Sequence, residues 1–169
     1  MSKAVLISIR PKWVEKIVNG EKTIEVRKTK PKLETPFKCY IYCTLPKYPH
    51  EDFIATDYPR PQFYGGGKVI GEFTCERIAL IAYDGGRLWC PTNAAFSTAT
   101  CLTQSEIIAY IGDKGRCYGW HMSDLCIYAQ PKGLDEFTRL RETKFGSEPV
   151  TIKRPPQSWC YVEAMKDGY

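Results

Sequence analysis

A short segment near the start of the chain holds three charged side chains whose chemistry suits a binding or catalytic site: Lys22, Glu25 and Arg27. Residues 23–28 alternate polar and apolar side chains, and this period of two predicts a strand with its isoleucine and valine on the core side. Glu25 and Arg27 must then share the opposite face of the strand. We therefore expect them, together with Lys22, to present their charges to an open cleft.

Each of these three groups has a definite chemical use. A lysine ammonium contacts phosphate or, when desolvated, loses its proton and acts as a general base near neutral pH. The carboxylate of Glu25 can accept hydrogen bonds from a base edge or a water, and Arg27 offers a planar fork suited to phosphate or a carbonyl. The alternative is structural, because Glu25 and Arg27 are two residues apart on one strand face and can simply pair with each other.

Four further residues are candidates for ligand contacts: Arg10, Trp120, His121 and Trp159. Both tryptophans lie beside polar residues in segments marked by glycine or proline, and stacking on a nucleobase contributes about 1–3 kcal/mol per base. His121 is a candidate acid, base or base-edge donor, and Arg10 adds a cation. The alternatives are that the tryptophans belong to the core and that the histidine is structural.

The eight cysteines predict neither a disulfide framework nor a metal site. Cys39 and Cys43 are four residues apart, but they flank an alternating strand pattern and no second close pair completes a tetrahedral zinc site. The sequence contains no G-x-S-x-G elbow, no P-loop and no dinucleotide fingerprint. We therefore expect no metal and no cofactor.

Composition favours a polyanionic partner and gives no sign of a membrane. The 169 residues carry a formal net charge of +5, and lysine and arginine are concentrated in the first third of the chain. Such a surface can engage phosphates, although it is also compatible with a solvated basic rim. No apolar run is long enough to cross a bilayer, and the opening residues lack the apolar core of a signal peptide. We expect a soluble cytoplasmic protein.

Hydrophobic periodicity predicts an α+β fold that is predominantly β. A helix over residues 11–19 starts at a proline and ends at a glycine, and a second helix opens with a capping box at 103–106 and runs to 111. The predicted strands are 4–9, 23–28, 37–44, 68–83 (with a bulge at Gly71), 117–121, 125–129 and 158–163. Residues 139–148 look polar and flexible, and 87–101 look irregular. The chain reads as a single domain over 1–169, with its core at about 4–163 and insertions at about 45–66 and 87–101.

Residues 20–27 resemble the signature of the ASCH superfamily, a G-x-K-x-x-E-x-R pattern that follows a first strand and a short helix. The preceding residues 7–11, with Trp13 one turn into the helix, are similar to the usual opening of this family, and 69–73 look like its later core strand. Residues 118–121 and 155–159 are similar to segments of bacterial and phage-borne members.

This resemblance implies a small PUA-like β-barrel, closed or nearly closed, flanked by short helices. It places Lys22, Glu25 and Arg27 at a cleft where the motif strand meets the loops. Such folds are associated with RNA or modified nucleosides, and some small members deacylate N4-acetylcytidine or cleave RNA. Deacylating members have threonine where this chain has Glu25, and Glu72 is our candidate for the second acid of an enzyme.

Three hypotheses follow for the function. The first is a binding module whose basic, aromatic-lined cleft holds RNA or a modified nucleoside, with phosphate anchored by Lys22 and Arg27. The second is a metal-independent hydrolase, an N4-acetylcytidine amidohydrolase or a ribonuclease, in which Lys22 works with Glu25 or Glu72. The third is a protein-interaction module of a mobile element.

Overall fold

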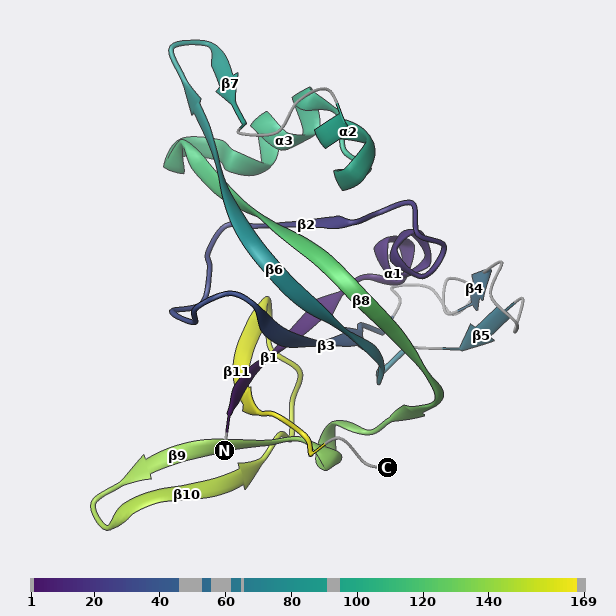
Figure 1. Ribbon diagram of the computed structural model, residues 1–169, viewed down its shortest axis with the longest axis vertical. Coiled ribbons are helices and arrows are strands. Elements are labelled where there is room, and N and C mark those ends of the chain that lie inside the picture. Colours follow the sequence, from purple (N-terminus) through teal and green to yellow (C-terminus); the bar gives the residue numbers. More distant parts are fainter. Residues whose placement is uncertain (1, 46–52, 56–61, 65, 91–94, 167–169) are drawn as a thin grey trace.

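The computed structural model describes residues 2–45, 53–55, 62–64, 66–90 and 95–166 (Figure 1). The helices are α1 (Pro11–Val18), α2 (Ala95–Thr100) and α3 (Gln104–Ile111), with 3-10 turns at Gly112–Lys114 and Leu134–Glu136. The strands are β1 (Lys3–Ile9), β2 (Ile24–Arg27), β3 (Phe37–Cys43), β4 (Phe53–Ala55), β5 (Gln62–Tyr64), β6 (Lys68–Asp84), β7 (Arg87–Trp89), β8 (Arg116–Lys132), β9 (Thr138–Thr143), β10 (Gly146–Thr151) and β11 (Trp159–Glu163). The predicted β-rich α+β class is confirmed at this level.

One curved sheet organises the fold. Its hydrogen-bonded order is β11-β1-β3-β6-β8-β2, and β7 is added to β6. β1 and β3 run parallel, whereas the other neighbours are antiparallel. The order has two ends, β2 and β11, and no backbone pairing between these ends occurs in the described part of the chain. The sheet therefore wraps around its core without the complete closure that a barrel requires.

The first elements form as their sequence predicts. α1 starts with Pro11 at its first turn and buries Val14, Ile17 and Val18, which share one face at helical spacing. Gly20 then adopts a φ of +74°, which favours glycine, and reverses the chain into β2. β1 is buried along nearly its whole length because it lies inside the sheet, with β3 on one side and β11 on the other.

The long strands β6 and β8 curve through irregularities in their pairing. The register shifts between Val69 and Gly71, and a Cβ on Gly71 would lie 2.4 Å from the carbonyl oxygen of Cys126. Real Cβ atoms do not approach so closely, so only glycine allows the two backbones to meet here. The predicted bulge at Gly71 is thus confirmed.

Two expectations about local structure are wrong, and one hairpin was not predicted. Residues 117–121 and 125–129 belong to one strand, β8, because Asp124 absorbs the irregularity with a φ of +49° instead of ending the strand. The hairpin that was not predicted is β9–β10, which contains residues 139–148; periodicity does not reveal it because nearly every side chain in it is exposed on both faces. The stretch expected to be irregular contains β7 and α2.

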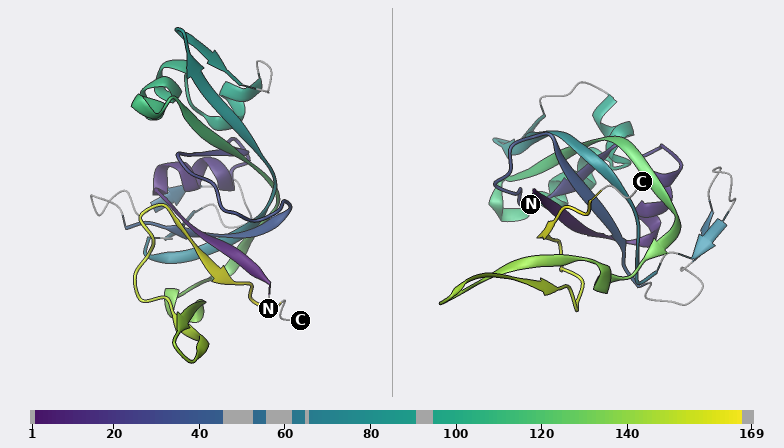
Figure 2. Two further views of the ribbon diagram at one scale, coloured as in Figure 1. Left: turned by 90° about the vertical axis from the view of Figure 1, so that its left-hand side faces the viewer. Right: turned by 60° about the horizontal axis from the view of Figure 1, so that its bottom comes forward.

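A second small core connects the helices to the outer part of the sheet. Phe96 of α2 and Ile107 and Ile111 of α3 pack against Val26 and Ile81. This packing holds α2 and α3 beside β2, as the views in Figures 1 and 2 show. It also sets the position of one side of the candidate site.

Much of the insertion expected at 45–66, and residues 91–94 of the second one, lie outside the described residues. Among the helices described, none has the length and apolar character needed to span a bilayer.

Candidate nucleotide-binding pocket

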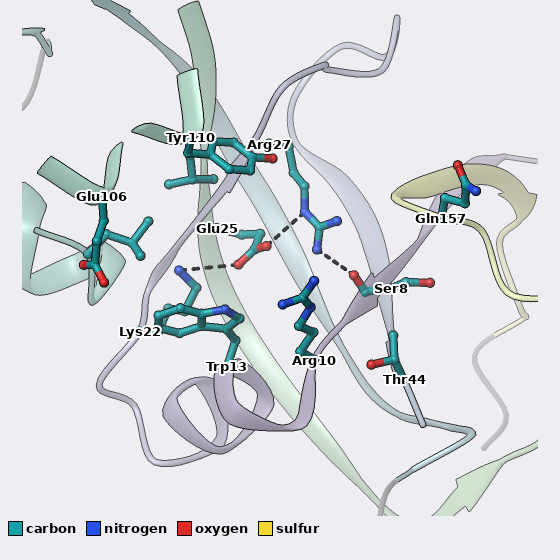
Figure 3. Close-up of a pocket in the computed structure, with 12 residues that line it drawn as sticks. Ser8, Arg10, Trp13, Lys22, Glu25, Arg27, Thr44, Glu106, Tyr110 and Gln157 are labelled. Carbon is teal, nitrogen blue, oxygen red and sulfur yellow. Dashed lines mark hydrogen bonds and ion pairs between the residues drawn. The ribbon is translucent and has the colours of Figure 1, made fainter. Parts of the chain in front are cut away.

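A pocket of about 440 Å³ lies where the two ends of the sheet approach each other, between α1, α3 and β2 (Figure 3). Three cationic side chains and two carboxylates contribute to its lining. The lining residues are Ser8, Arg10, Trp13, Lys22, Glu25, Val26, Arg27, Thr44, Leu102, Glu106, Tyr110 and Gln157. We call Lys22, Glu25 and Arg27 the wall of the pocket, and Arg10, Trp13, Glu106 and Tyr110 its rim.

Lys22 is buried in the wall with only 3% of its surface exposed. The turn after α1 places it there, since its backbone N–H donates to the carbonyl of Lys16. Its ammonium donates to the carbonyl oxygen of Thr100 at 2.7 Å, which satisfies a carbonyl at the end of α2 that has no partner within the helix. Its Nζ also lies 3.4 Å from Oε2 of Glu25 and 5.1 Å from the centre of the Trp13 ring.

Arg27 connects the two ends of the sheet. Its Nε donates to Oε1 of Glu25 at 2.9 Å, and its Nη2 donates to the carbonyl of Ser8 in β1 at 2.6 Å. Its Nη1 reaches Oγ of Ser158, just before β11, at 3.2 Å. One guanidinium thus bridges β2 to β1 and to the start of β11, where backbone pairing is absent among the described residues. Most of its donors are used inside the protein.

Glu25 is held between these two cations, yet one of its carboxylate oxygens accepts no hydrogen bond. The residue is 5% exposed, and its Oε2 is buried without a hydrogen bond among the described residues. The Lys22 ammonium at 3.4 Å supplies charge but not a hydrogen bond. A buried acceptor without a donor is unfavourable. Because this oxygen belongs to a pocket-lining residue, a ligand donor that reached it would remove that cost.

The rim differs from the wall because its cation is exposed. The guanidinium of Arg10 has no hydrogen bond or ion pair with any described residue, whereas its backbone carbonyl accepts from Trp13 and Val14 at the start of α1. Across the pocket, Tyr110 points inward from α3, and burial raises the pKa of its phenol. Glu106 accepts a hydrogen bond from the backbone of Thr103 in the predicted capping box, which lowers its pKa.

Four predicted site residues do not line this pocket. Trp120 has no exposed surface and packs in the main core against Phe37 and Trp159, so its ring has no free face for a ligand. Trp159 is half-buried, and its Nε1 donates to the hydroxyl of Thr29. His121 lies beside Arg77, and desolvation followed by this neighbouring charge lowers its pKa.

Glu72 also lies elsewhere. It accepts a hydrogen bond from the hydroxyl of Tyr128 and forms an ion pair with Lys38 at 2.9 Å. Lys22, Glu25, Arg27 and Arg10 are therefore the predicted residues that the fold brings together. On β6, Glu72 lies opposite Tyr40 of β3 and Cys126 of β8, and none of these three residues lines the pocket.

Sequence patterns missed the side of the pocket formed by α3 and by the segment that precedes β11. Glu106, Tyr110 and Gln157 contribute there. The capping box located the start of α3, but no pattern indicates which face of that helix meets the motif strand. In the described part of the chain, no group of three or more His, Cys, Asp or Glu side chains could hold a metal ion, and all eight cysteines are free thiols.

Comparison with solved structures supports the fold. ASCH from Zymomonas mobilis is similar over 95% of this chain and 87% of its own, with a TM-score of 0.55 and 19% identity. Two single-residue mutants of that protein are similar with TM-scores of 0.54 and 19% identity, covering 96% and 95% of this chain and 91% and 88% of theirs. No protein-family model matches the sequence, and no curated protein matches it. The chain therefore has the fold of ASCH proteins.

Proposed function

We propose that this chain binds RNA or a modified nucleoside in the pocket between α1, α3 and β2. The observation that carries the proposal is that two groups without hydrogen-bond partners, one cationic and one anionic, belong to residues that line the same pocket. Arg10 offers an exposed guanidinium without a described partner, and Oε2 of Glu25 is a buried acceptor without a donor. A phosphate and the N–H edge of a base supply the two complementary groups.

The contacts of the wall modify the roles expected from the sequence. Lys22 and Arg27 are engaged by Glu25 and by backbone carbonyls, so in our proposal they orient the Glu25 carboxylate. Arg10 then takes the phosphate. Trp13 and Tyr110 provide aromatic surface on opposite sides of the pocket for the ring of the base.

Binding of a fluorescently labelled single-stranded RNA to the wild type and to Arg10→Ala tests this proposal. We expect affinity to fall steeply with rising salt concentration. Arg10→Ala should weaken binding about tenfold, and it should reduce the salt slope, the slope of log affinity against log salt concentration, by about one. Arg154→Ala removes an exposed cation outside the pocket and serves as the matched control. Equal affinities for wild type and Arg10→Ala would contradict the assignment of the phosphate to Arg10.

A second candidate function is a metal-independent hydrolase of N4-acetylcytidine or RNA. It is favoured by the close approach of the buried Lys22 ammonium and the Glu25 carboxylate, a pair that can exchange a proton during a reaction. Incubation with N4-acetylcytidine and with RNA, followed by chromatography, tests it. Turnover that is lost in Glu25→Gln supports the enzyme, whereas no turnover by the wild type removes it and leaves the binding proposal.

The remaining expectations belong to the same proposal. They are a PUA-like relationship, a bacterial or phage origin and a cytoplasmic location. The protein-interaction hypothesis is the competing outcome, and a protein partner that stays bound to the chain after nuclease treatment would favour it over RNA binding.

A further inference from the structure

The outer parts of β6, β7 and β8 carry an exposed face that the pocket does not include. Direct pairing places Leu80 opposite Tyr118, and it places Ala82 opposite both Trp89 and Arg116. Paired residues share one side of a sheet. Ile81 and its partner on β8 point the other way, into the core beneath α2 and α3. We call the face formed by Leu80, Ala82, Arg87, Trp89, Arg116 and Tyr118 the platform.

The platform combines apolar surface with positive charge. Leu80 is 51% exposed and Trp89 is 56% exposed, although both are large apolar side chains. The Arg87 guanidinium lies 4.9 Å from the centre of the Trp89 ring, and the Lys30 ammonium lies 5.6 Å from that of Tyr118.

The cations of this face are available to a partner. The side chains of Arg87, Arg116 and the neighbouring Lys30 have no hydrogen bond or ion pair with the described residues. Asp84 is the one described acidic residue paired with a member of the platform. Aromatic rings beside unpaired cations suit the stacked bases and phosphates of a single-stranded nucleic acid. Charge complementarity thus selects a polyanionic occupant over an apolar one.

The platform continues directly from the pocket. Arg27 of the wall pairs with Tyr118, and Tyr118 pairs with Leu80, so the three lie in one row across β2, β8 and β6. Figure 1 shows β7 extending the same sheet beyond β6. The next row joins Arg116 of β8, Ala82 of β6 and Trp89 of β7. At about 4.8 Å between neighbouring strands, the four strands from β2 to β7 span about 14 Å. This length matches about four nucleotides stacked at about 3.4 Å.

We propose that the ligand is a strand of several nucleotides, one of which enters the pocket while its neighbours lie across the platform. This inference rests on the proposed function, because the pocket holds one nucleotide of the same strand. It selects an oligonucleotide over a free nucleoside as the physiological ligand.

Two probes test the inference by fluorescence titration: a nucleoside 5′-monophosphate and a mixed-sequence single-stranded RNA of about eight nucleotides, with a DNA of the same sequence as a further arm. We expect the wild type to bind the RNA at least about tenfold more tightly than the monophosphate. Trp89→Ala should remove most of this length advantage, since one stacked base changes Kd by roughly 5- to 150-fold. Arg116→Ala should lower the salt slope for the RNA alone.

The matched control is Phe145→Ala, which removes another exposed aromatic side chain, at the tip of the β9–β10 hairpin. It should keep the full length advantage. Arg10→Ala should weaken both probes and leave their ratio unchanged. An RNA that binds no more tightly than the monophosphate, or a ratio unaffected by Trp89→Ala, would overturn the platform while the pocket stands. If Arg10→Ala has no effect but Trp89→Ala does, the proposed pocket function fails and the platform stands.

Discussion

The wall and the rim of the pocket both contain cationic side chains, but only those of the wall have hydrogen-bond partners within the described part of the protein. In the wall, Lys22 and Arg27 are buried or half-buried, and each contacts Glu25 and a backbone carbonyl. On the rim, Arg10 is exposed and its guanidinium has no partner among the described residues. The number of cationic side chains near a pocket therefore differs from the number that is available to a ligand. The wall charges support the fold, and the rim charge remains available for binding.

The largest expected effect is on stability, from Glu25→Ala. Its removal leaves two cations in a largely buried place without their shared carboxylate, which costs about 3 kcal/mol or more in the free energy of unfolding. Urea denaturation measures this loss. Glu21→Ala is the matched control, because the ion pair of Glu21 with Lys16 is exposed and contributes less than about 1 kcal/mol. Similar losses for the two variants would remove the distinction between buried and exposed charges.

A smaller loss should follow Arg27→Lys. A lysine keeps the charge but cannot reach Glu25, Ser8 and Ser158 together, because it lacks the planar fork. We expect a loss of about 2 kcal/mol in the free energy of unfolding, measured by urea denaturation. Arg154→Lys, at an exposed position, should leave stability unchanged. A fully stable Arg27→Lys would show that the charge alone is sufficient.

Glu106 on the rim should contribute a pH-dependent stability of modest size. Its folded pKa lies below the ordinary value of 4.5 because the backbone of Thr103 donates to the carboxylate. The contribution is therefore present above about pH 4.5 and is lost as the pH falls through the folded pKa. Thermal unfolding of wild type and Glu106→Gln across this range measures it. A difference between the two proteins that stays constant with pH would contradict the prediction.

The smallest effect on stability is expected for Arg10→Ala, the variant that weakens RNA binding in our proposal. Since its guanidinium has no described partner, the free energy of unfolding should change by less than about 0.5 kcal/mol. The same denaturation experiment measures it. A large loss in the free energy of unfolding would show that Arg10 supports the fold as the wall residues do, and the proposed difference between wall and rim would be wrong.

Local patterns predicted the elements that carry the motif. The alternation around Ile24 and Val26 gave β2, Pro11 and Gly20 bounded α1, and the Thr103 capping box formed as expected. These features depend on residues close together in the chain, whose backbone preferences act locally. For that reason the sequence also placed Glu25 and Arg27 together.

Other parts of the pocket depend on contacts between residues far apart in the chain. Lys22 donates to Thr100, 78 residues away, and α3 reaches the pocket only through its packing on β2. Trp120 was a candidate for stacking because its neighbours are polar, but its position opposite Glu25 turns it into the core. A period of two separates the two faces of a strand, but it does not tell which face the curved sheet encloses.

The bridge that Arg27 makes between the ends of the sheet has a dynamic consequence. β2 is paired through its backbone on one side, to β8, while its other side is joined to β1 and to residue 158 by a side chain. A strand fastened in this way can detach locally at a lower free energy than the inner strands. Its amide protons should exchange with solvent sooner than those of β1 and β3, and a guest bound against Glu25 should slow that exchange.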